Sequence, residues 1–147
     1  MELPSWITDH IKLYKTDPEK AHFFDCSDVG GKPMTATLLL TTRGRKSGRD
    51  ISIPLIYGRH GSAYVVIGSK GGAPDHPDWY KNLVASPSCH IQVGKNGYQA
   101  RARTAAGAER TALWAQMQEI YPPYDDYQRT AKDREIPVVV LETVAPA

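Results

Sequence analysis

The sequence has few cysteines, no long hydrophobic run and little net charge. Cys26 and Cys89 are its two cysteines and form no C-x-x-C pair, which favours a reducing cytoplasm, although one disulfide between them stays open. No run of about 18 apolar residues occurs, and the first residues lack the basic segment of a secretory signal, so we expect neither a membrane span nor export. The 18 Lys and Arg against 16 Asp and Glu argue against a surface built as a whole for nucleic acid.

Signatures of several common enzyme classes are also missing. The 5 histidines show no metal-ligand spacing, and no H-E-x-x-H, G-x-S-x-G or G-x-G-x-x-G occurs. The sequence therefore gives no support to a zinc enzyme, a serine hydrolase or a Rossmann site, and we expect no metal. The aromatic set of 8 Tyr and 3 Trp against 2 Phe is typical of a cleft that stacks on a ring and hydrogen-bonds to it.

The 147 residues predict one domain, which begins with helices and continues with strands. We expect a helical segment and loop over residues 1–36 and a strand-rich core over 37–142. Ser5 is expected to cap the first helix, and Asp17 is expected to cap a short second one.

Short runs rich in Leu, Ile, Val and Thr, separated by glycine-containing turns, predict six strands at 37–42, 51–57, 63–68, 88–93, 98–104 and 138–142. Helical patterns over 76–85 and 108–120 interrupt them. Because most links are tight, a doubly wound parallel sheet with its long crossovers is excluded. The pattern predicts an α+β fold, an antiparallel barrel or sandwich with helices packed outside.

Turn residues and one proline refine this topology. Gly58–Gly61 has the length of a hairpin link, and Asn96-Gly97 is a favoured type I′ turn pair. Pro54 cannot donate to a sheet ladder, so its strand is expected at an edge or at a bulge. An edge strand next to a basic turn is a place where a ligand can lie.

The densest charge is the segment RGRKSGR at 43–49, with 4 cations in 7 residues between two expected strands. Its glycines allow backbone N–H groups to point outward, and Arg45, Lys46 and Ser47 supply further donors, as a phosphate or carboxylate cradle requires. The alternatives are a solvated hairpin loop and a basic nucleic-acid patch.

Three further motifs carry side chains suited to a flat ligand. GSKGGA at 68–73 combines a hydroxyl, a cation and glycines that permit close backbone approach, and its alternative is a flexible turn. DWYKN at 78–82 begins a helix and could wall a pocket, although such aromatic residues are more often core. YPPYDDY at 121–127 could present phenols over a cofactor or close a loop onto the barrel.

Taken in order, these motifs resemble the deazaflavin-dependent nitroreductase and quinone reductase family. The resemblance rests on TLLLTTRGRKSGRDISIPLIY, YVVIGSKGGAPDHPDWYKNLVASP and YPPYDDYQ with IPVVVLE, and covers roughly residues 37–142. It implies an antiparallel split β-barrel, similar to FMN-binding barrels, that binds reduced coenzyme F-420, an 8-hydroxy-5-deazaflavin. It further implies an oxidoreductase that passes a hydride to a quinone, a nitroaromatic or another activated unsaturated acceptor.

The resemblance also implies roles for single residues. The basic turn would hold the phosphate and polyglutamate tail, Pro54 and Leu55 would lie against the ring, Ile67–Lys70 would bond its edge, and the helix start would close the ribityl side. The implied cofactor set is Arg45, Lys46, Ser47, Ile51, Ser52, Ile53, Pro54, Leu55, Ile67, Gly68, Ser69, Lys70, Gly71, Gly72, Asp78, Trp79, Tyr80, Lys81, Asn82 and Tyr124. Ile56, Tyr121 and Tyr127 would face the substrate, and Ser69 and Tyr124 would position it or donate a proton.

Two departures from the family pattern bear on the acceptor and on membranes. Ile56 stands where some nitroreducing members carry a tyrosine, which favours an acceptor other than a nitroimidazole. Residues 1–36 differ from the start of membrane-attached members, so membrane contact is expected to be peripheral at most.

Other functions stay open beside this one. The alternatives are a split barrel that binds FMN or haem, a non-enzymatic F-420 carrier, and a nucleic-acid module, which the small net charge disfavours. The expected partners are a small-molecule acceptor and a separate F-420-reducing dehydrogenase, linked through diffusing cofactor, with the chain as a monomer or homodimer.

Overall fold

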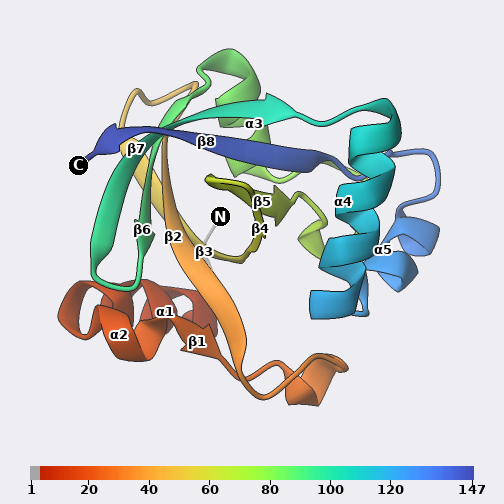
Figure 1. Cartoon of the computed structure of the whole chain (residues 1–147), viewed down its shortest axis with the longest axis horizontal. Helices are drawn as coiled ribbons and strands as arrows, with labels where there is room; N and C mark the ends of the chain where they lie inside the picture. The colour runs from red at the N-terminus through yellow and green to blue at the C-terminus, as the bar shows by residue number, and fades with distance from the viewer. Residues whose placement is uncertain (1–3) are drawn as a thin grey trace.

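The computed structural model describes residues 4–147, whose strands form one eight-stranded antiparallel sheet (Figure 1). Its order is β1-β2-β6-β7-β8-β5-β4, and β3 pairs with β2. The strands are β1 (Phe23–Phe24), β2 (Thr35–Arg43), β3 (Asp50–Ile56), β4 (Gly58–His60), β5 (Ala63–Ile67), β6 (Ser88–Val93), β7 (Asn96–Thr104) and β8 (Val138–Pro146). The helices are α1 (Ser5–Thr16), α2 (Pro18–Ala21), α3 (Asp78–Ala85), α4 (Gly107–Ile120) and α5 (Tyr124–Ala131), with 3-10 turns η1 (Ser27–Val29) and η2 (Lys70–Gly72).

This sheet is a half-barrel with helices outside it, so the expected α+β antiparallel class is confirmed. Among the described strands β3 pairs only with β2, and β4 pairs only with β5, which leaves the sheet open between them. Eight strands stand where about six were expected, because β1 and β4 span 2 and 3 residues and are too short to show a period. Residues 1–3 of the expected domain lie outside the described part of the chain.

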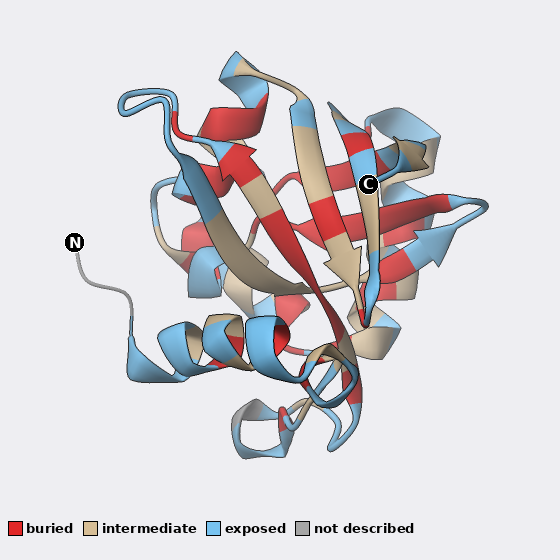
Figure 2. Ribbon diagram, turned by 90° about the vertical axis from the view of Figure 1, so that its left-hand side faces the viewer, coloured by how far each residue is buried: buried red, intermediate tan, exposed pale blue. Residues whose placement is uncertain are grey.

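The inner strands bury both faces, as their unbroken apolar runs suggest. In β2, Leu38 and Leu40 pack into the cluster beneath α3, while Leu39 packs against Tyr14 of α1. In β5, every residue is buried, alternately toward the α4–α5 side and toward the α3 side. Figure 2 shows this buried band along the central strands and the exposed outer face of α1. The sheet is therefore a rigid support for the loops at its ends.

The two expected helix caps had different outcomes. Asp17 caps α2, since its carboxylate accepts the Lys20 N–H at 3.3 Å, as predicted. Ser5 was the wrong cap for α1: it is the first helical residue, and Pro4 occupies the cap position without a side-chain bond.

The two expected hairpin links were placed wrongly. Val93 pairs with Asn96, so Gly94-Lys95 makes the turn, and Gly94 has the positive φ of 57° that such a turn requires. The Gly58–Gly61 link is itself strand β4 plus a turn at Gly61, and it pairs back onto β5. Turn chemistry indicated hairpins in both regions, but the register decided which residues reverse the chain.

Pro54 lies on an edge strand, which confirms the expectation drawn from its missing N–H. β3 pairs with β2 from Asp50 to Ile56, and the chain then continues directly into β4. β3 and β5 correspond to two strands that were expected to follow each other in the sequence, but they are not hydrogen-bonded to each other.

The C-terminal helices cover one end of the half-barrel. In α4, Leu113 and Met117 are buried on one face, as the helical spacing predicted. Helix α5 was not expected, because Pro122-Pro123 indicated a stiffened loop. Pro123 is instead its N-cap, and Asp125 and Asp126 lie in its first turn, where acidic groups stabilise a helix.

Candidate cofactor site

The basic turn between β2 and β3 is a compact loop with outward-facing donors. It is closed by two backbone bonds of 2.8 Å, from Gly48 N–H to Gly44 O and from Gly44 N–H to Arg49 O. Within residues 4–147 the N–H groups of Lys46 and Ser47 have no acceptor, and Lys46 makes no ion pair. The Ser47 hydroxyl oxygen accepts the Arg49 N–H at 3.2 Å and keeps its own proton to donate. Open amides beside an ammonium group suit an anion such as a phosphate.

Arg45 differs from its neighbours because the protein itself uses its charge. Its guanidinium donates to Asn82 Oδ1 at 2.8 Å and lies 3.4 Å from an Asp78 carboxylate oxygen, and its side chain is 24% exposed. Asn82 is 2% exposed and also donates to Thr42 Oγ1 at 3.2 Å. The structure thus joins three expected site residues, but it uses Arg45 to tie the turn to α3 rather than leaving it open for a ligand.

The second turn, Gly68–Ala73, has a backbone that glycine makes possible. Lys70, Gly71 and Gly72 all have positive φ, and a Cβ added at Gly72 would lie 2.8 Å from the Tyr127 carbonyl oxygen. Gly72 N–H donates to Ser69 O at 2.9 Å. Glycine is required at position 72 both by the backbone angle and by the close approach of α5.

Both turns flank the start of α3. Arg45 and Asn82 hold the basic turn on one side, and a Cβ on Gly68 would lie 3.6 Å from Pro77, the N-cap of α3, on the other. Trp79 is buried in the core with Leu83, as the structural interpretation of this motif expects. The half-buried Tyr80 shares a 2.9 Å hydrogen bond with Thr104, and Lys81 is half-buried.

Strand β3 supplies an apolar edge next to the basic turn. Ile53 and Leu55 pack against the buried cluster beneath α3, while Ile51 is 45% exposed and lies beside Gly44. The Ser52 hydroxyl is bonded to Thr41 at 2.7 Å. Ile56 packs on the other cluster, the one that contains Ile67 and the three tyrosines. The strand beside which a flat ring was expected is therefore largely apolar and has one open edge.

The three tyrosines form a packed group between α4, α5 and the sheet. The Tyr121 and Tyr127 hydroxyls lie 2.8 Å apart, and the Tyr121 and Tyr124 rings meet edge to face at 4.8 Å. Tyr124 is 4% exposed, so its phenol is not on an open rim. Burial raises the pKa of Tyr121 and Tyr124, and both stay protonated near neutral pH. Packing is the role that this geometry displays.

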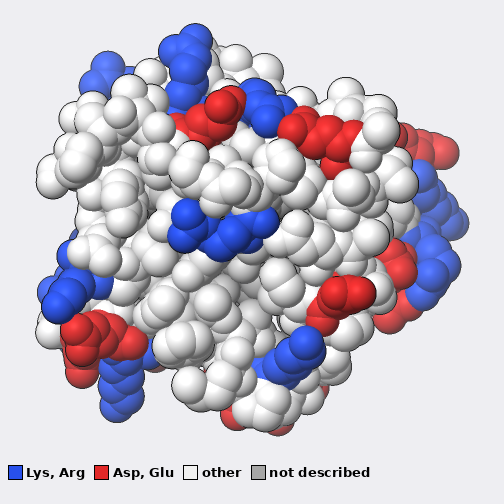
Figure 3. Space-filling model, viewed as in Figure 1, with Lys and Arg blue, Asp and Glu red and all other residues white. Residues whose placement is uncertain are grey.

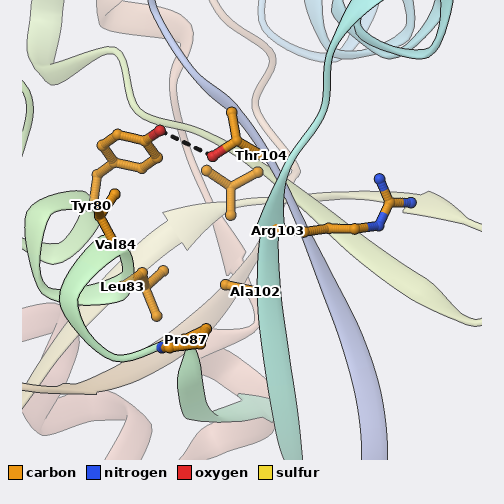
Figure 4. Close-up of a pocket in the computed structure, with 8 residues that line it drawn as sticks. Tyr80, Leu83, Val84, Pro87, Ala102, Arg103 and Thr104 are labelled. Carbon is orange, nitrogen blue, oxygen red and sulfur yellow. Dashed lines mark hydrogen bonds between the residues drawn. The ribbon is translucent and has the colours of Figure 1, made fainter.

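Two hollows lie at the margins of these motifs. A groove of about 270 Å³ between α3 and β7 is lined by Tyr80, Leu83, Val84, Pro87, Ala102, Arg103, Thr104 and Val139 (Figure 4). Tyr80 alone of these belongs to the expected site. A second hollow of about 570 Å³ lies over β2, β6 and β7 and includes Arg43, Cys89 and Arg101. On the face shown in Figure 3, acidic and basic groups alternate without forming one large basic patch.

Comparison with known proteins decides the family. Residues 18–143 match the family profile described as F-420H(2)-dependent quinone reductase. The chain belongs to this family. The match starts well before residue 37, so the family's pattern also takes in α2 and β1, which the sequence resemblance did not cover.

Several known proteins and solved structures resemble the chain over most of its length. An F-420H2-dependent quinone reductase of Mycobacterium tuberculosis is 38% identical over 149 residues, which cover 96% of this chain and 98% of that protein. The solved structure of an F-420-H2 dependent reductase (FDR-A) is 40% identical, with a TM-score of 0.66, covering 72% of this chain and 93% of that one. A structure described as a domain-swapped dimer is 34% identical, with a TM-score of 0.68, covering 92% and 98%.

One residue that holds the Gly68–Ala73 turn escaped the sequence analysis. Arg134, in the loop between α5 and β8, is 8% exposed and donates to Gly68 O, Ser69 O and Ala73 O at 2.7–2.9 Å. Its only sequence signal is its place in the charged run 132–135, which precedes the apolar segment of the last strand. In the described part of the chain, no helix is long and apolar enough to cross a membrane.

Proposed function

We propose that this chain is an F-420H2-dependent quinone reductase, which moves a hydride from reduced coenzyme F-420 to a quinone. The observation that carries the proposal is the basic turn, whose unpartnered Lys46 side chain and open N–H groups lie on one side of α3 while the glycine turn lies on the other. The family match and the 38% identical quinone reductase support the same activity.

The residues present fit the two ends of this coenzyme. Lys46 and Ser47 would hold the phosphate and the start of the acidic tail, and Arg45 would position their turn through Asn82. The ring would lie between the apolar wall of β3, residues 51–55, and the turn 67–72, with 78–82 beside the ribityl chain. Bound in reduced form, the deazaflavin supplies the hydride. The chain's own part is to hold the flat ring and the acceptor together and to exclude water.

The acceptor would bind on the side of Ile56. Its neighbours in that cluster are Tyr121, Tyr124 and Tyr127, which together make an apolar, aromatic surface suited to a planar quinone. Tyr124 would shape this surface by packing. The half-buried Ser69, on the second turn, is the hydroxyl that we propose positions the acceptor or passes it a proton.

The cellular setting follows from the chemistry. A separate F-420-reducing dehydrogenase must regenerate the reduced coenzyme, because a quinone reductase consumes it. Both cysteines are free, which fits a reducing cytoplasm. We further propose that the chain works as a monomer or homodimer.

Titration with F-420 and with FMN, followed by fluorescence quenching, tests the cofactor. We expect micromolar or tighter binding of F-420 and clearly weaker binding of FMN. Equal affinities, or tighter FMN binding, would instead support the FMN-type barrel. Steady-state oxidation of reduced F-420 by menadione then tests the reaction, and tight binding without turnover would support the carrier alternative.

A further inference from the structure

Arg134 links the second turn to helix α5 through an ordered chain of hydrogen bonds. Its backbone is held by Gln128 of α5, whose side chain donates to Arg134 O at 2.8 Å and accepts from Ile136 N–H at 2.9 Å. Its guanidinium reaches back across the fold to the carbonyl oxygens of Gly68, Ser69 and Ala73. The donors of a guanidinium group have a rigid planar geometry. A buried arginine that donates hydrogen bonds to three carbonyl oxygens of one loop therefore fixes the shape of that loop.

The same guanidinium contacts His76 from the segment that leads into α3. Arg134 Nη1 lies 3.1 Å from His76 Nδ1. Since a guanidinium only donates, Nδ1 must accept, and His76 is neutral with its proton on Nε2. The ring lies against Tyr80 at 5.0 Å. The contact therefore exists only while His76 is uncharged.

We propose that Arg134 and His76 are a positioning pair, which holds the Gly68–Ala73 turn in the shape that receives the coenzyme ring and releases it when His76 is protonated. This inference rests on the proposed function for its ligand, but its account of the turn stands on the protein alone. Neither residue was among the site residues expected from the sequence.

The charges around His76 favour the neutral form. Arg134 faces it from the α5–β8 loop and Lys81 from α3, while Asp75 of its own segment opposes them. Burial, followed by these two cations, holds the pKa of His76 below its usual 6.5. A group with a depressed pKa in the held state stabilises that state fully above pH 6.5. The benefit is lost as the pH falls below that value.

The first test uses the protein without cofactor. Amide hydrogen exchange of Gly72 and Ala73, whose N–H groups bond to Ser69 O and Lys70 O, reports the turn directly. We expect Arg134→Gln to speed their exchange about tenfold or more, with Arg134→Lys intermediate and the Val140 amide of β8 unchanged. Arg129→Gln is the matched control, because Arg129 lies on the exposed face of α5 and pairs only with Asp126 within the described chain.

The second test separates titration from mere loss of a side chain. His76→Asn keeps an acceptor near the Nδ1 position and cannot be protonated, whereas His76→Leu keeps none. We expect His76→Asn to retain the wild-type exchange rate at pH 7.5 and His76→Leu to lose protection. As the pH falls to 5.5, only the wild-type turn should open further, after correction for intrinsic exchange.

The third test measures the dissociation constant of F-420 over the same pH range. The ratio of the wild-type constant to that of His76→Asn should be near one above pH 7. It should rise about threefold or more by pH 5.5, with any titration of the ligand cancelling in the ratio. Identical pH profiles for the two proteins would overturn the role of His76, and unchanged exchange in Arg134→Gln and Arg134→Lys would overturn the pair. If wild-type protein does not bind F-420, the proposed function fails, and the exchange data still decide whether the pair holds the turn.

Discussion

Neighbouring cations of the basic turn have separate tasks, which their contacts distinguish. Arg45 donates a hydrogen bond to Asn82 and forms an ion pair with Asp78, so its charge is already paired within the protein. Lys46 is exposed and has no ion-pair partner in residues 4–147. An arginine can satisfy several acceptors at a fixed angle, whereas a lysine carries a mobile point charge. We therefore expect recognition of an anion by this turn to depend on Lys46.

Replacing Lys46 by Ala is expected to weaken F-420 binding about tenfold. A charge-assisted contact contributes roughly 1.5–3 kcal/mol, and solvent exposure places this one at the low end. The measurement is a fluorescence titration at two salt concentrations, and the difference from wild type should shrink at high salt.

Lys95 provides the control for this variant. It also lies in a tight hairpin turn, but between β6 and β7, where it pairs loosely with Glu19 at 3.8 Å. Lys95→Ala should bind F-420 as wild type does. If Lys46→Ala and Lys95→Ala behave alike, the basic turn is only a solvated loop.

The cysteines are expected to be unreactive in the folded protein. Burial raises the pKa of Cys89 to about 12 and also raises that of Cys26. At pH 8, Cys89 should react with a disulfide reagent on the order of 10² times more slowly than an ordinary thiol of pKa about 8.5, because its smaller thiolate fraction outweighs the greater nucleophilicity of that thiolate. The measurement compares native and urea-unfolded protein, and equal labelling rates in the two states would contradict the raised pKa of Cys89.

At the scale of elements, α3 connects the two turns of the proposed site. Its first residues hold the basic turn through Asn82 and Asp78, and its N-cap Pro77 lies beside Gly68 of the second turn. Its apolar face, with Trp79 and Leu83, is anchored in the core. One short helix, anchored in the core, therefore fixes the positions of the two turns relative to each other.

Asn82→Ala should lower the free energy of unfolding by about 1–3 kcal/mol. The substitution leaves Arg45 without its closest acceptor and the buried Thr42 hydroxyl without a donor. Urea unfolding measures the loss, and F-420 affinity should fall as well. Val84→Ala, an exposed change on the same helix, should stay within about 0.5 kcal/mol of wild type. Equal midpoints for the two variants would show that the tie contributes nothing.

Helix α5 separates the packing role of Tyr124 from a chemical one. Tyr124→Phe keeps the buried ring, so we expect near-normal stability and a menadione reduction rate within about threefold of wild type. Tyr124→Ala should lose about 3–5 kcal/mol of stability, as large buried aromatic residues do. A loss of about 100-fold or more in turnover for Tyr124→Phe, with stability intact, would instead assign its hydroxyl to proton donation.

At the scale of the whole molecule, the half-barrel leaves one side open between β3 and β4. The two turns, α3 and α5 are supported by a sheet whose two faces are buried. We therefore expect the protein to rearrange little when it binds a ligand there. Binding should therefore appear directly as added stability, because a ligand that binds only the folded state shifts the unfolding equilibrium.

Reduced or oxidised F-420 at about 100 times its dissociation constant should stabilise the fold by about 2.7 kcal/mol. For a chain of this size, that corresponds to a rise in Tm of about 5–10 °C. The same concentration of FMN should give a clearly smaller rise, and thermal unfolding monitored by circular dichroism measures both. A shift with FMN that matches or exceeds the shift with F-420 would argue against the deazaflavin assignment.

Local chemistry along the sequence determined the α+β class, the Asp17 cap, the edge position of Pro54 and the exposed, cationic character of the basic turn. Each depends on neighbours within a few residues, through helix caps, side-chain period or a missing N–H. Only the tertiary structure decided that β3 pairs with β2 alone, that Arg45 is spent on α3, and that Tyr124 is buried. It also brought Arg134 to carbonyl groups more than 60 positions earlier in the chain. Such contacts join residues distant in sequence, and their choice depends on the packing of the whole sheet and its helices.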